Sequence, residues 1–208
     1  LYGSAFLAGF NENLVNMALM AIMGEFGVGS VTAQWLVTGY MIVATVVVMC
    51  MAFFYRRFAL RVLFFAGAAF TLAGSALGLF AGNFALLMVA RLVQAVGSGL
   101  FIPLMMNTIL AVTPKNKLGG AMATGGCMIT FGPAFAPVVC GAMVTVFGWH
   151  SVFLVPLAVM AALAVLGVAF VRNLPTSEAR LDLPSVGLSA VFLFTLSFGL
   201  AQLTTNAM

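Results

Sequence analysis

The chain has 208 residues, of which 64% are hydrophobic and 6% are charged, and its formal net charge is +4. An ordinary soluble domain has about 25% charged residues, so this composition excludes a soluble globular protein. We interpret the small positive charge as membrane topology rather than as a basic patch, so no nucleic-acid partner is expected.

Long apolar segments follow one another along almost the whole sequence. At about 20 residues for each membrane crossing, they predict seven transmembrane helices. These helices are expected at residues 1–23, 34–54, 62–81, 84–112, 119–146, 151–171 and 185–204. The predicted fold class is therefore all-α and integral to the membrane, with the lipid bilayer as the first expected partner.

Lysine and arginine gather in alternate connections between the predicted helices. The connections after the second, fourth and sixth helices hold seven of the eight cations, namely Arg56, Arg57, Arg61, Lys115, Lys117, Arg172 and Arg180. Cytoplasmic loops carry an excess of Lys and Arg. The amino terminus is therefore expected in the cytoplasm, and the protein is expected to cross the plasma (inner) membrane several times.

The first predicted helix carries an acidic residue inside its apolar stretch. Glu12 is flanked by Asn11, Asn13 and Asn16. A charged side chain at mid-membrane depth costs on the order of 3 kcal/mol, so it usually marks an ion or substrate path. Glu12 is therefore predicted to be functional, with the three asparagines as candidate substrate ligands.

The fourth predicted helix contains the eighth cation, Arg91, with Gln94 three residues later and Asn107 further along. If the first six helices are two repeats of three, Glu12 and Arg91 lie in the first helix of each repeat. Inverted-repeat transporters place their binding site between such helices, near the bilayer midplane. The alternative is a buried ion pair that only fixes helix packing, which is weak evidence for stability because desolvation opposes it.

The fifth predicted helix is rich in small residues and proline. Gly132, Ala136 and Cys140 recur every four residues, a spacing that lets helix backbones approach closely. Two prolines four residues apart remove helix hydrogen bonds and favour a bend. The predicted hinge or sliding interface comprises Gly132, Pro133, Pro137 and Gly141.

The longest polar connection runs from residue 172 to residue 184 and contains two prolines and charges of both signs. It is predicted to be a cytoplasmic linker between a six-helix unit at 1–171 and a seventh transmembrane helix at 185–208. The odd helix count and the absence of an initiator Met predict a truncated chain. The missing carboxyl-terminal half of the same chain is then an expected partner.

Motifs for enzyme chemistry are absent from the sequence. There is no glycine-rich loop followed by Lys-Ser or Lys-Thr, and there is no HExxH. The three cysteines lie in apolar runs without a CxxC pair. The chain is therefore not expected to be an enzyme or to hold a metal ion or a cofactor.

The order of these motifs resembles the amino-terminal half of the major facilitator superfamily, specifically its drug:proton antiporter branch with fourteen transmembrane helices. The resemblance covers nearly the whole chain. It rests on FNENLVNMAL at 10–19, QWLVTGY at 34–40, RLVQAVGSGLFIP at 91–103, GPAFAPVVCG at 132–141, WHSVF at 149–153 and the segment at 181–202. The first-helix acid is displaced, since Asn11 stands where an Asp is usual in that branch and Glu12 follows it.

This resemblance implies a bundle of two three-helix inverted repeats followed by a seventh helix. It also implies multidrug efflux of lipophilic or cationic compounds by alternating access, driven by the proton gradient without a cofactor. Glu12, Arg91 and Gln94 would couple the protons. Small amphiphilic substrates would be bound by Asn11, Asn13, Asn16 and Asn107. A nutrient or metabolite permease of the same fold and a seven-helix receptor-like membrane protein remain as alternatives.

Overall fold

The structure is a computed structural model that describes residues 1–171 and Thr195. Within them the chain forms six long helices and no strand. Apart from Thr195, the predicted linker at 172–184 and the predicted seventh helix at 185–208 lie outside the described residues.

The helices follow the apolar segments of the sequence in order. They are α1 (Tyr2–Phe26), α2 (Ser30–Arg57), α3 (Leu60–Leu79), α4 (Phe84–Val112), α5 (Leu118–Phe147) and α6 (Leu154–Phe170), and the short 3₁₀ helix η1 (Trp149–Phe153) leads into α6. All six spans in the described part of the chain are long and apolar enough to cross a membrane. The predicted all-α membrane fold is therefore confirmed.

The ends of the helices have local causes. Helix α1 stops at Gly27, which adopts a left-handed backbone conformation with φ of 62° that glycine reaches without steric cost. Helix α4 starts after Asn83, whose side-chain oxygen accepts a hydrogen bond from the Leu86 backbone N–H at 2.7 Å. This side chain satisfies one of the free N–H groups at the start of the helix.

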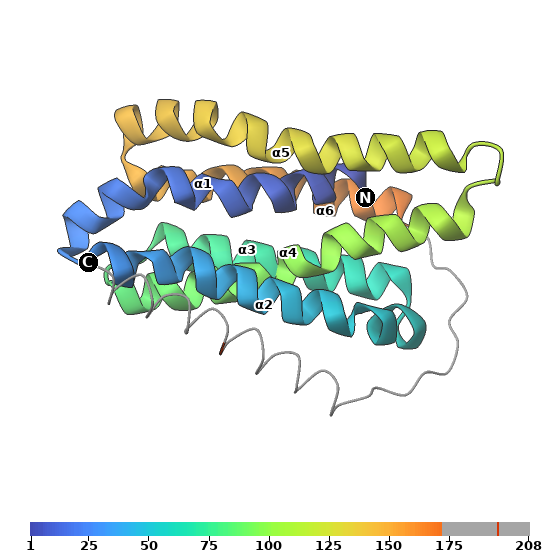
Figure 1. The fold of residues 1–208 in the computed structure, drawn as a ribbon, viewed down its shortest axis with the longest axis horizontal. Helices are drawn as coiled ribbons and strands as arrows, with labels where there is room; N and C mark the ends of the chain where they lie inside the picture. Colours follow the sequence, from blue (N-terminus) through green and yellow to red (C-terminus); the bar gives the residue numbers. More distant parts are fainter. Residues whose placement is uncertain (172–194, 196–208) are drawn as a thin grey trace.

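Helices α1 and α4 form the centre of the bundle (Figure 1). Helix α1 packs along α5, and α4 packs along α2 and α3. The first helix of each three-helix unit thus packs on the second helix of the other unit: α1 on α5, and α4 on α2. Two related three-helix units would pack in this way. Half or more of the α1 and α4 spans are buried, at 50% and 56%, against 17% for both α2 and α5. Residues that point inward from α1 and α4 therefore determine the interior of the bundle.

The contact between α1 and α5 depends on small side chains. A Cβ atom added at Gly132 would lie 2.6 Å from both the Phe10 backbone nitrogen and the Phe6 carbonyl oxygen. Ala136 and Cys140 continue this buried stripe at four-residue intervals. The Cys140 thiol donates a hydrogen bond to the Leu14 carbonyl at 3.4 Å. The predicted small-residue stripe is therefore the surface on which α5 approaches α1.

Candidate functional site

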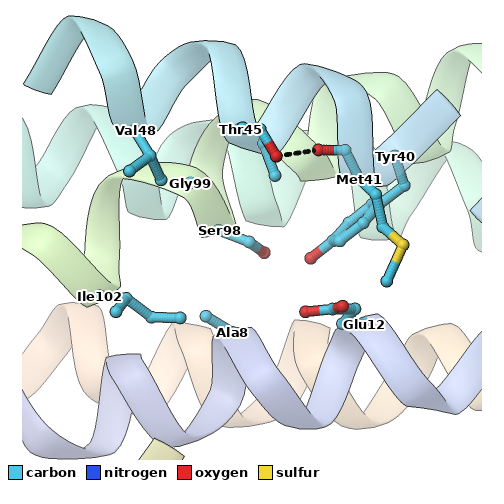
Figure 2. Close-up of a pocket in the computed structure, with 10 residues that line it drawn as sticks. Ala8, Glu12, Tyr40, Met41, Thr45, Val48, Ser98, Gly99 and Ile102 are labelled. Atoms are coloured by element: carbon cyan, nitrogen blue, oxygen red, sulfur yellow. Dashed lines mark hydrogen bonds between the residues drawn. The ribbon is translucent and has the colours of Figure 1, made fainter. Parts of the chain in front are cut away.

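A cavity of about 340 Å³ opens between α1, α2 and α4 (Figure 2). Its wall has two residues from α1, five from α2 and three from α4, namely Ala8, Glu12, Tyr40, Met41, Ala44, Thr45, Val48, Ser98, Gly99 and Ile102. Glu12 is the one charged residue in this lining. The cavity therefore combines a mostly apolar wall with a single carboxylate.

Three polar side chains point toward one another across this cavity. Figure 2 shows the Glu12 carboxylate facing the hydroxyl groups of Tyr40 and Ser98. Glu12 is partly exposed, whereas Tyr40 is 2% exposed and Ser98 is 5% exposed. Among the described residues the Tyr40 hydroxyl has no hydrogen-bond partner. Thr45, the fourth polar residue of the wall, donates to the Met41 carbonyl of its own helix at 2.7 Å.

Arg91 lies behind the cavity wall and is fully buried, at 0% exposure. Its Nη1 donates to the side-chain oxygen of Gln94 at 3.0 Å and to the backbone carbonyl of Asn11 at 3.4 Å. The Gln94 Nε2 donates in turn to the Ser75 hydroxyl at 2.8 Å, and that hydroxyl donates to the Thr71 carbonyl at 2.7 Å. This chain of hydrogen bonds joins α4 to α1 on one side and to α3 on the other.

The Arg91 charge is also stacked on an aromatic ring. Its Cζ atom lies 4.1 Å from the centroid of the Tyr40 ring, well within the range of a cation–π interaction. In the described part of the chain, Nε and Nη2 of Arg91 have no hydrogen-bond partner. The hydrogen bonds of Arg91 therefore reach Gln94 and Asn11, and not the carboxylate of Glu12.

The asparagines of α1 have different surroundings. Asn11 is buried, at 1% exposure, and its Nδ2 has no partner among the described residues. Asn13 donates from Nδ2 to the Gly9 carbonyl of its own helix at 3.2 Å. Asn16 follows Glu12 by four residues and so adjoins it on the same helical face. Of the three, Asn16 is best placed to extend the cavity-facing surface of α1.

Asn107 is separated from this group along α4. It follows Arg91 by sixteen residues, which corresponds to about 24 Å of helix. It does not line the cavity beside Glu12. The described structure therefore does not bring Asn107 together with the other residues predicted to bind substrate.

The residues of the predicted hinge lie on two sides of α5. Gly132 is buried and Pro133 partly buried against α1, where a Cβ added at Gly9 would lie 3.3 Å from the Pro133 Cδ. Pro137 and Gly141 are exposed. Helix α5 runs without interruption through both prolines. The hinge role of these four residues remains a prediction.

Sequence reasoning missed several residues of the site. Tyr40, Ser98, Ser75 and Thr71 were not predicted as functional, although Tyr40 ends the QWLVTGY segment. That segment was the one available signal for Tyr40. Serine and threonine are ordinary in membrane helices, where they bond neighbouring backbone or side chains. Their part in the Arg91 network emerges only when the helices are packed.

Residues 1–208 match the Major Facilitator Superfamily. The chain is 35% identical over 200 residues to the lincomycin resistance protein of Bacillus subtilis, covering 96% of this chain and 42% of that protein. It is 30% identical over 198 residues to a multidrug resistance protein B homolog of Mycobacterium tuberculosis, covering 94% of this chain and 36% of that protein. The chain thus spans less than half the length of these curated relatives.

Solved structures share the same architecture. A peptide transporter in complex with sulfate has a TM-score of 0.70 and 18% identity, covering 99% of this chain and 46% of that chain. A D-xylose–proton symporter has a TM-score of 0.64 and 14% identity, covering 99% of this chain and 51% of that chain. At these identities the likeness concerns the fold alone, and it supports the same type of helical bundle for this chain.

Proposed function

The chain belongs to the major facilitator superfamily, and we propose that the complete protein exports lipophilic or cationic compounds from the cell in exchange for protons. The observation that carries this proposal is the single carboxylate, Glu12, in an otherwise apolar cavity between α1, α2 and α4. The relatives named for lincomycin and multidrug resistance support export over uptake. Membership of this superfamily leaves the seven-helix receptor alternative without support.

The chemistry of the cavity suits an exchange reaction. A carboxylate in an apolar wall is stabilised either by a proton or by a cationic ligand, because an isolated buried charge is costly. A proton and a cationic compound would therefore compete for Glu12. The aliphatic and methionine side chains that line the rest of the cavity, such as Met41 and Ile102, offer an adaptable surface for lipophilic groups.

Arg91 and Gln94 would assist this exchange from behind the wall. The guanidinium is fixed by hydrogen bonds to Gln94 and to the α1 backbone. A fixed positive charge such as that of Arg91 would stabilise the carboxylate of Glu12 once its proton has been released. Opening to alternate sides of the membrane would follow from rocking of this half against the carboxyl-terminal half, with the amino terminus in the cytoplasm.

Replacement of the carboxylate tests this proposal. In the complete protein, Glu12→Gln keeps the size and polarity of the side chain and removes its ability to exchange a proton. We expect this variant to lose proton-driven transport of a fluorescent cationic dye into inverted membrane vesicles while it is still inserted at the wild-type level. Dye transport at the wild-type rate by Glu12→Gln would refute the assignment.

Glu25 provides a matched control on the same helix. It lies at the end of α1, where its carboxylate accepts a hydrogen bond from the Trp149 Nε1 at 2.5 Å. Glu25→Gln makes the same chemical change and keeps an acceptor oxygen for the indole. We expect Glu25→Gln to retain transport, so that a loss seen only in Glu12→Gln reports the cavity.

A further inference from the structure

We propose that Tyr40 is a positioning residue whose aromatic ring holds the Arg91 guanidinium apart from the Glu12 carboxylate. The inference rests on the function proposed above, since it explains how Glu12 stays available to a proton or a cation. Its starting observation is that two opposite charges share the interior of the bundle without a hydrogen bond between them. The ring of Tyr40 is the group that lies against one of them and reaches toward the other.

One face of the Tyr40 ring is covered by the guanidinium, whose Cζ is 4.1 Å from the ring centroid. The hydroxyl at the end of the same ring points into the cavity toward Glu12 (Figure 2). Tyr40 is 2% exposed, and the guanidinium of α4 lies against its ring. We infer that a buried ring in this position occupies space that the guanidinium would need in order to approach the carboxylate.

The Arg91 side chain has a reason to move if the ring is removed. Its Nε and Nη2 are buried and have no hydrogen-bond partner among the described residues. Charged donors without partners are costly in the interior of a protein. Residues 1–171 contain two carboxylates, Glu12 and Glu25. Glu25 lies thirteen residues beyond Glu12, about 20 Å along α1, and it is already bonded to Trp149.

Few other titratable groups face Glu12 from the helices packed on α1. Helix α4 contributes Arg91 and α2 contributes Tyr40. The other titratable residues of α2 lie ten or more positions beyond Tyr40, about 15 Å or more along the helix, and are Cys50, Tyr55, Arg56 and Arg57. Helix α5 holds Cys127, which is exposed, and Cys140, which donates to the Leu14 carbonyl. Helix α6 has no titratable side chain, and His150 of η1 lies beside Ala81 at 3.3 Å, away from the cavity. A change in the ionisation of Glu12 that follows removal of the Tyr40 ring, and not removal of its hydroxyl alone, would therefore be transmitted by Arg91.

Chemical labelling of Glu12 tests the inference without measuring transport. Dicyclohexylcarbodiimide enters membranes and reacts with protonated carboxyl groups, so its reaction with Glu12 decreases as the pH rises. Mass spectrometry of the complete protein in native membranes gives the pH at which labelling of Glu12 is half-maximal. In Tyr40→Leu, Arg91 would pair with Glu12, and we expect this midpoint to fall by about one pH unit or more.

Two further variants separate the ring from other features of α2. Tyr40→Phe keeps the ring and removes the hydroxyl, so its labelling midpoint should equal that of the wild type. Tyr55→Leu makes the leucine substitution fifteen residues further along α2, about 22 Å away, and should also leave the midpoint unchanged. A shift in Tyr40→Phe would assign the effect to the hydroxyl and overturn the proposal.

A wild-type midpoint in folded Tyr40→Leu would likewise overturn it. Folding is checked by size-exclusion chromatography. If the leucine variant does not fold, Tyr40→Met repeats the test, since methionine is unbranched and flexible and also has no aromatic face. If neither variant folds while Tyr40→Phe does, the ring serves only core packing and the proposal is wrong. Because labelling is read without a transport substrate, failure here is distinguishable from failure of the dye-transport experiment.

Discussion

The contact between α1 and α5 can be tested by placing one methyl group at two glycines of the same helix. Gly132 faces α1, where an added Cβ would lie 2.6 Å from the backbone atoms of Phe6 and Phe10. Gly141 is exposed on α5, and an added Cβ there would meet no atom within 4 Å. The variants Gly132→Ala and Gly141→Ala therefore differ in packing and not in chemistry.

The size of the effect follows from this comparison. Alanine favours a helix over glycine by about 1 kcal/mol, and both variants share this gain, so it cancels between them. What remains is the overpacking at Gly132, which costs about 1–3 kcal/mol in a well-packed interior. Backbone atoms of Phe6 and Phe10 cannot rotate away, so α1 and α5 must separate. A chain of about 150–250 residues shifts by about 2–4 °C per kcal/mol, and a complete protein about twice as long shifts by about half of that. Gly132→Ala should therefore unfold about 1–6 °C below Gly141→Ala.

Thermal unfolding of the complete protein in detergent measures this difference. The variants are made in a version whose one remaining cysteine is the buried Cys140, which lies on the same interface and is bonded to Leu14. A maleimide dye that fluoresces after reaction with thiols then reports the exposure of Cys140. The label should react at a lower temperature in Gly132→Ala than in Gly141→Ala. Equal midpoints, or a more stable Gly132→Ala, would refute the view that close backbone contact at Gly132 holds these helices together.

Two other predictions concern the Arg91 network and the orientation of the chain. Gln94→Ala leaves Arg91 and Ser75 without their shared partner, so it should lower the free energy of unfolding by about 1–3 kcal/mol, measured as a reduced thermal midpoint. The control Asn107→Ala, elsewhere on α4, should leave the midpoint unchanged. Equal losses of stability in the two variants would contradict this prediction. The connection after α3 is expected on the outer side of the membrane. Gly82→Cys, in a version with the native cysteines replaced, should therefore react with a membrane-impermeant maleimide in intact cells. Labelling only after cell lysis would show that the predicted orientation of the chain is reversed.

The helices themselves could be predicted because a bilayer requires long apolar runs. The sequence places the fourth helix at 84–112, and α4 has the same bounds. The start of the second helix was predicted at 34, whereas α2 begins at Ser30. Its first turn includes polar residues, and a prediction from hydropathy leaves such residues out of a membrane helix even where the helix includes them. The 3₁₀ turn η1 before α6 was also not predicted, and it contains Trp149, which is 3% exposed.

The site could be predicted only where a charge stands out in an apolar segment. Glu12 and Arg91 were predicted as site residues for this reason. Tyr40 was not predicted because aromatic residues are common in membrane helices, where most of them only pack against other apolar side chains. The contact between Arg91 and α1 uses the backbone carbonyl of Asn11. Such a contact depends on how the helices pack. It cannot be predicted from residue types, because every residue has a backbone carbonyl.

The displaced acid of the first helix has a structural consequence. Residue 11 faces the interior, since Asn11 is 1% exposed and its carbonyl accepts a hydrogen bond from Arg91. Residue 12 is turned by about 100° around α1 and opens to the cavity. An acid at position 11, where the resembling branch usually has Asp, would lie in the same interior as the guanidinium. With the acid at position 12, the positive charge rests on the Tyr40 ring while the carboxylate faces the space in which a compound would bind. Under the proposed function, this separation would leave Glu12 free to alternate between a proton and a cationic compound while Arg91 acts from behind the cavity wall.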